Sequence, residues 1–102
     1  MKVQLLYFDG CPHVAGARHV LRAVLAACAL PEVAVEELDV EAPTTPAELR
    51  DWGSPTILVN GADVAGEEAP SGRSCRLYAG EERAGVPPRA LIERRLREAT
   101  ES

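Results

Sequence analysis

The stretch from Tyr7 to His13 constrains this chain more than any other. An apolar run over residues 3–8 ends there, and Cys11 stands directly before Pro12, a residue that favours the first position of a helix. The first N–H groups of a helix have no partner within it, and the helix dipole adds partial positive charge at the same end. Both effects favour the thiolate of Cys11 over its thiol, and a protonated His13 would add a second positive charge. The stretch therefore predicts a reactive cysteine at a strand-to-helix turn; the alternative is an inert cysteine buried at a strand end.

The next residues show a helical pattern followed by a strand pattern. Residues 12–29 carry apolar side chains at helical spacing, and residues 33–40 have the composition of a second strand. This order predicts parallel pairing with the strand at 3–8 through a right-handed crossover. Cys28 lies on the apolar stripe of the helix, roughly 25 Å from Cys11 at 1.5 Å per residue, so we expect it in the core and not in a disulfide with Cys11.

Turn signals divide the second half of the chain. Thr45-Pro46-Ala47-Glu48 has the pattern of a capping box and predicts a short helix that ends near Trp52. Asn60-Gly61 predicts a tight hairpin that pairs residues 56–59 with about residues 63–65. A last helix is indicated by an apolar stripe after two prolines: Leu91, Ile92, Leu96 and Ala99.

Composition limits the class of protein. The 102 residues form a single domain, 1–102, with eleven basic and sixteen acidic side chains and a net charge of −5. The arginines near the C-terminus alternate with glutamates, so no nucleic-acid surface is expected. Three cysteines are too few for a disulfide scaffold and indicate a reducing compartment, and the first apolar run is too short for a signal peptide or a membrane span. We therefore expect a cytoplasmic protein without a membrane partner or a cofactor.

The order of these elements resembles the thioredoxin and glutaredoxin superfamily: a strand, Cys-Pro at a helix start, a strand, a short helix, Ser-Pro-Thr before a hairpin, and a last helix. The resemblance implies an α/β fold with a central four-stranded mixed sheet in the order 2-1-3-4, flanked by helices, with a loop insertion before the last helix. It makes Cys11 the attacking cysteine and places a cis Ser54–Pro55 bond beside it, with Thr56 next in the segment and the backbone of Ser54 pairing with a substrate strand. Cys-Pro-His also resembles the start of the Cys-Pro-His-Cys site of periplasmic disulfide oxidases, but Val14 stands in place of the second cysteine.

The chain also resembles a group of small bacterial thioredoxin-like proteins that share Tyr-Phe-Asp-Gly-Cys-Pro, the Ser-Pro-Thr strand entry and a late Ser-Cys-Arg-Leu-Tyr, here residues 74–78. Some members carry an alkylmercury-lyase label. Cleavage of a carbon–mercury bond needs two soft thiolates and a nearby acid, and Cys11, Cys75 and Asp9 are groups of the right kinds.

The insertion at residues 67–86 leaves two interpretations open. The hairpin should return the chain toward Cys11, so Cys75 is either a resolving or metal-binding thiol or a structural cysteine. Arg76 either stabilises a thiolate or binds an anion in the substrate-binding region, or it is an ordinary surface arginine.

Three functions follow, in order of preference. The first is a thiol–disulfide oxidoreductase with Cys11, Pro12, His13 and Cys75 in the catalytic site and a protein or small-molecule thiol or disulfide as substrate. The second is a protein that holds a soft metal ion, mercury or copper(I), between Cys11 and Cys75. The third is a redox-inactive adaptor that keeps only the fold.

Overall fold

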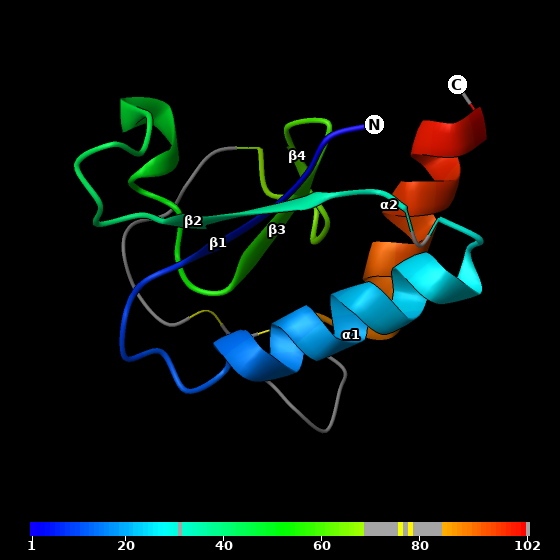
Figure 1. Ribbon diagram of the computed structural model, residues 1–102, viewed down its shortest axis with the longest axis horizontal. Helices are drawn as coiled ribbons and strands as arrows, with labels where there is room; N and C mark the ends of the chain where they lie inside the picture. The colour runs from blue at the N-terminus through cyan, green and yellow to red at the C-terminus, as the bar shows by residue number, and fades with distance from the viewer. Residues whose placement is uncertain (31, 69–75, 77, 79–84, 102) are drawn as a thin grey trace.

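The computed structural model of the chain describes residues 1–30, 32–68, 76, 78 and 85–101. Figure 1 shows a four-stranded sheet with two long helices packed against it. The elements, in chain order, are β1 (Val3–Tyr7), α1 (Val14–Ala27), β2 (Val35–Asp39), a 3-10 turn (Ala47–Leu49), β3 (Thr56–Val59), β4 (Ala62–Asp63) and α2 (Arg89–Glu101). Within these residues, no helix is both long enough and apolar enough to cross a bilayer.

The sheet has the strand order β2-β1-β3-β4, as the sequence predicts. β1 pairs parallel to β2 and antiparallel to β3, and β3 pairs antiparallel to β4. Asn60 and Gly61 turn the last hairpin with positive φ angles of 52° and 83°, the combination that a two-residue type I′ turn requires. β4 is shorter than expected and begins directly after this turn.

Two glutamates in β2 lie on opposite faces of the sheet. The pairing with β1 runs without interruption through Glu36 and Glu37, so no bulge forms there. On one face, Glu36 accepts a hydrogen bond of 2.9 Å from Gln4. On the other, Glu37 forms a two-bond ion pair with Arg18 of α1, at 2.8 and 2.9 Å.

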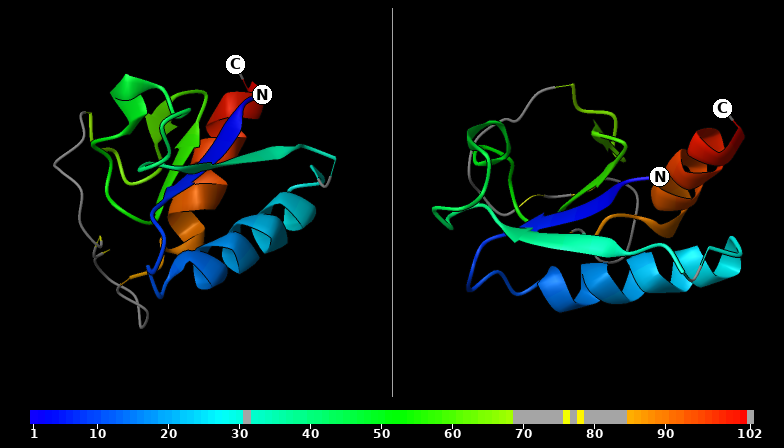
Figure 2. Two further views of the ribbon diagram at one scale, coloured as in Figure 1. Left: turned by 60° about the vertical axis from the view of Figure 1, so that its left-hand side comes forward. Right: turned by 45° about the horizontal axis from the view of Figure 1, so that its top comes forward.

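Both long helices cover one face of the sheet, as Figure 2 shows from two further sides. The apolar stripes of the two helices pack on β1 and β3 and form the main core with them. This core includes Leu5, Leu21, Val24, Ile57, Ile92 and Leu96. The opposite face holds a smaller cluster of Leu6, Val40, Trp52 and Leu58. The first and last helices therefore lie on one face of the sheet, as expected, and Leu49 of the 3-10 turn packs on the cluster of the opposite face.

The predicted capping box at residues 45–48 is not formed. The hydroxyl of Thr45 donates to the carbonyl of Asp39 at the end of β2, and Pro46 occupies the N-cap position without a side-chain cap. Because the tertiary partner removes the cap, this segment makes a single 3-10 turn in place of a helix that reaches Trp52.

Candidate thiol site

A tight turn delivers Cys11 from the end of β1. The N–H of Cys11 donates to the carbonyl of Phe8 at 3.3 Å, which closes a four-residue turn. Gly10 has φ +88°, the left-handed conformation that the third position of a type II turn requires and that glycine adopts without strain. Asp9 is exposed on this turn, while Cys11 is half-buried. The sequence thus places a partly accessible thiol at the edge of the sheet.

The helix that follows starts later than expected. α1 begins at Val14, with His13 as its N-cap residue, so Pro12 precedes the helix and does not occupy its first position. The carbonyl of His13 accepts the N–H of Ala17 at 3.0 Å. No described side chain caps the first turn, and that turn contains no acidic residue. The positive end of the helix is therefore not neutralised by its own side chains, and Cys11 lies just before it.

His13 is not the exposed side chain that a first-turn position suggests. It is half-buried, and its ring lies so close to Gly85 that a Cβ built there would be 2.2–2.5 Å from three ring atoms. Gly16 makes a similar approach to Val86, whose methyl group would be 3.0 Å from an added Cβ. The residues before α2 therefore pack on the first turn of α1 and fix the imidazole beside the Cys11 turn.

The Ser54–Pro55 segment enters β3 next to the same turn. β1 and β3 are in register with Leu6 opposite Thr56. Continuing this register places Ser54 and Pro55 beside the residues that lead into Cys11. The Ser54–Pro55 bond is cis, as expected. Ser54 is fully buried, and its hydroxyl has no hydrogen-bond partner among the described residues.

Arg76 joins this segment through both its backbone and its side chain. Its N–H donates to the carbonyl of Ser54 at 2.8 Å. Its guanidinium binds both carboxylate oxygens of Asp63 at 3.0 Å each and the hydroxyl of Thr56 at 3.1 Å. The interpretation of Arg76 as a surface arginine is wrong, because its side chain is 12% exposed and that of Asp63 is 0% exposed. Burial alone would lower the pKa of Arg76, but the hydrogen bonds that it donates to Asp63 raise the pKa overall, so the guanidinium stays charged.

Two aromatic rings enclose the guanidinium. Its central carbon lies 4.7 Å from the ring centre of Tyr78 and 5.9 Å from that of Trp52, within the range of cation–π attraction. The Tyr78 hydroxyl donates to the carbonyl of Pro55. Burial raises the pKa of this hydroxyl well above its usual range; the Arg76 cation opposes this rise, and the charge of Asp63 adds to it. The phenol therefore stays protonated near the thiol.

The four residues expected to bind substrate, Ser54, Pro55, Thr56 and Arg76, are thus brought together and bonded to one another or to their neighbours. Sequence reasoning missed Asp63, Trp52 and Tyr78, which complete this cluster. A carboxylate between the apolar residues of a short hairpin was a usable signal for Asp63, because a buried acid needs a cationic partner.

Two of the three cysteines lie in the described part of the chain. Cys11 and Cys28 are free thiols. Cys28 closes the far end of α1 and packs partly on the main core, as expected. Cys75, the candidate resolving or metal-binding thiol, lies outside the described residues. Among the described residues, no group of three or more His, Cys, Asp or Glu side chains could hold a metal ion.

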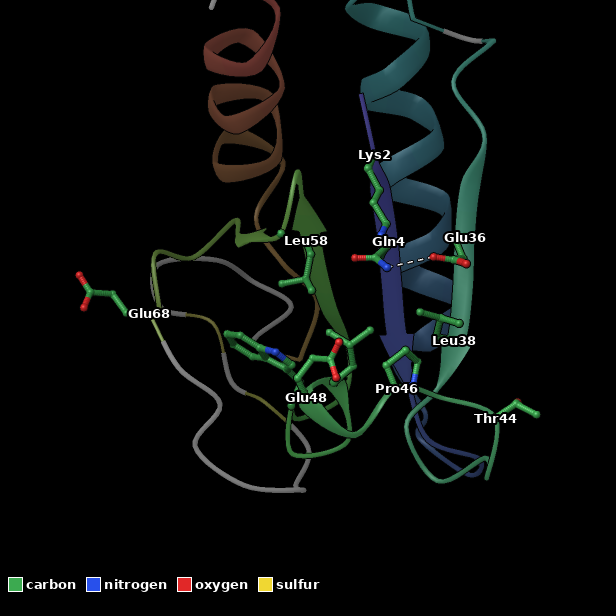
Figure 3. A pocket seen from close by; sticks show the side chains of 12 residues that line it. Lys2, Gln4, Glu36, Leu38, Thr44, Pro46, Glu48, Leu58 and Glu68 are labelled. Atoms are coloured by element: carbon green, nitrogen blue, oxygen red, sulfur yellow. Dashed lines mark hydrogen bonds between the residues drawn. The ribbon is translucent and has the colours of Figure 1, made fainter.

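A separate hollow of about 650 Å³ lies on the face of the sheet away from the helices (Figure 3). Gln4, Glu36, Leu38 and Leu58 form its floor, and Glu48 and Trp52 border it. Cys11 is not among its lining residues.

Comparisons with protein-family models, curated proteins and solved structures find no match to this chain. Its function is therefore inferred from the site itself.

Proposed function

We propose that this protein carries out thiol–disulfide exchange through Cys11. The observation that carries the proposal is the position of this free, half-buried thiol on a glycine turn just before the uncapped start of α1. Helix starts stabilise anions, and thiolates are the nucleophiles of disulfide exchange. Cys28 is also a free, half-buried thiol, but it lies at the C-terminal end of the same helix, where the helix dipole disfavours a thiolate.

The proposed step is a single exchange. The Cys11 thiolate attacks one sulfur of a disulfide, a new S–S bond forms, and the old S–S bond breaks. The displaced sulfur leaves as a thiolate and takes a proton from solvent. A second thiol then attacks the sulfur of the half bound to Cys11, the S–S bond to Cys11 breaks, and Cys11 is regenerated as a thiolate. The second thiol leaves in a new disulfide with that half, so each cycle consumes one thiol and releases another, and a further thiol completes the net reduction.

The other expected residues enter this proposal in supporting roles. Pro12 shapes the turn before α1, and His13 holds its ring beside the thiol through the contact with Gly85. The releasing thiol is either Cys75 or a small thiol from solution. The strand order and the Cys-Pro and Ser-Pro positions support a thioredoxin-like variant of the fold, and the need for free thiols supports a reducing compartment such as the cytoplasm.

Mixed-disulfide mapping tests the proposal. The protein is mixed with bis(2-hydroxyethyl) disulfide at neutral pH, quenched with acid, and mapped by mass spectrometry. We expect the adduct on Cys11, its loss in Cys11→Ser, and its persistence in the matched variant Cys28→Ser. An adduct that forms equally fast in Cys11→Ser and in the native protein would overturn the proposal.

A further inference from the structure

We propose that the substrate of Cys11 is a low-molecular-weight disulfide and not an extended polypeptide. This inference rests on the proposed exchange activity and narrows its substrate class. The observations that support it concern the backbone beside the thiol, because a bound peptide would form its hydrogen bonds with that backbone.

An extended peptide binds beside a strand by pairing with free backbone groups at its edge, and these bonds supply much of its affinity. The backbone nearest the Cys11 turn belongs to Gly53, Ser54 and Pro55, by the register of β1 and β3. All three residues are buried. A peptide that approaches the thiol from this side therefore meets a closed surface.

Each of the three carbonyls in this segment already accepts a hydrogen bond from the chain itself. Gly53 accepts the Thr56 hydroxyl at 2.6 Å, and Ser54 accepts the N–H of Arg76 at 2.8 Å. Pro55 accepts the Tyr78 hydroxyl, and as a proline it has no N–H to offer. The segment thus has its acceptors occupied by internal donors.

The donors are held firmly in place. Arg76 is fixed by two hydrogen bonds to the fully buried carboxylate of Asp63, and its guanidinium lies against the ring of Tyr78. A competing peptide would have to displace Arg76 and Tyr78 together and leave Asp63 buried without its cation, which is strongly unfavourable. A small disulfide needs no backbone pairing, and it reaches Cys11 at the half-exposed turn without disturbing this cluster.

The chemistry is the exchange already described. Cys11 takes one half of the small disulfide, and the other half leaves as a thiolate. A low-molecular-weight thiol then attacks the bound half, which leaves in a new disulfide with that thiol while Cys11 returns to a thiolate. No group beyond Cys11 changes its covalent state.

The test compares two symmetric disulfides, so that attack on either sulfur is equivalent. One is bis(2-hydroxyethyl) disulfide, and the other is the disulfide dimer of a nine-residue peptide with a central cysteine. Second-order rate constants are measured for the native protein, corrected by those of Cys11→Ser, and divided by the rates of N-acetylcysteine with the same disulfides. This division removes the intrinsic reactivity of each substrate.

We expect the corrected rate for the small disulfide to exceed that for the peptide dimer by at least about tenfold, because the carbonyls of Gly53, Ser54 and Pro55 already have internal donors and a peptide would have to compete with them. Equal corrected rates, or a faster reaction with the peptide, would overturn the inference and leave the exchange function standing. No Cys11-dependent rate with either disulfide would overturn both. The three outcomes are therefore distinguishable in one experiment.

Discussion

Arg76→Met should destabilise the fold far more than an arginine substitution elsewhere on the protein. The change keeps a long side chain but removes three hydrogen bonds, two to Asp63 and one to Thr56. It also removes the cation that lies 4.7 Å from the Tyr78 ring. The Asp63 carboxylate, with 0% side-chain exposure, would keep one described partner, the N–H of Glu67 at 3.1 Å.

The expected cost follows from this burial. Removing one member of a buried ion pair costs about 3–5 kcal/mol, because the remaining charge is left without compensation. A domain of this size has about 5–15 kcal/mol of stability in total, so the variant should unfold at a much lower urea concentration. Arg18→Met is the matched control. Its ion pair with Glu37 has side chains 41% and 25% exposed, and such pairs contribute about 0.2–1 kcal/mol.

Urea unfolding measured by circular dichroism and by the fluorescence of the single tryptophan gives both free energies. The double variant Asp63→Asn/Arg76→Met completes a cycle, in which we expect a coupling of at least about 2 kcal/mol. If Arg76→Met lost no more stability than Arg18→Met, the buried pair would not have the role that the geometry gives it.

Two other contacts can be tested by stability. Gly85→Ala should cost about 1–3 kcal/mol by overpacking, because the new Cβ would lie 2.2–2.5 Å from ring atoms of His13, and His13→Ala in the same chain should recover much of that loss. An unchanged unfolding midpoint in Gly85→Ala would show that the contact is absent. Glu37→Gln should cost about 0.5 kcal/mol at neutral pH. Because hydrogen bonds from Arg18 lower the pKa of Glu37 from its usual 4.5, this contribution is present above pH 4.5 and is lost as pH falls through the lowered pKa. The native and Glu37→Gln stabilities should therefore converge in acid; a constant difference would contradict this reasoning.

The sheet could be predicted from the sequence because its signals are local. The apolar run at residues 3–8 and the Asn60-Gly61 turn each specify their own conformation, and the strand order followed from the resemblance. The prediction of a short helix after Thr45 was wrong because the side chain expected to cap it has another partner. Thr45 has the right chemistry for a cap, but its hydroxyl donates to the carbonyl of Asp39, six residues earlier at the end of β2.

Part of the candidate site could likewise be predicted from local sequence, and part depends on contacts between distant residues. The position of Cys11 before a helix was visible in the order of residues, but the environment of Arg76 was not. Its partner Asp63 lies in β4, and an acid between apolar hairpin residues indicates only that a cation is needed, not that Arg76 supplies it. The contact between His13 and Gly85 is equally long-range, and only the folded chain shows that the imidazole is held in place.

The most direct measurement of the central claim is the rate at which each described thiol of the native protein is alkylated. A limiting amount of iodoacetamide is added at neutral pH, the protein is unfolded and fully labelled with a heavy-isotope form, and the two labels are compared at Cys11 and Cys28 by peptide mass spectrometry. Both thiols are half-buried, but Cys11 should react at least about tenfold faster, because it precedes a helix start whereas Cys28 lies at a helix C-terminus. Equal rates, or faster labelling of Cys28, would contradict the assignment of Cys11 as the nucleophile.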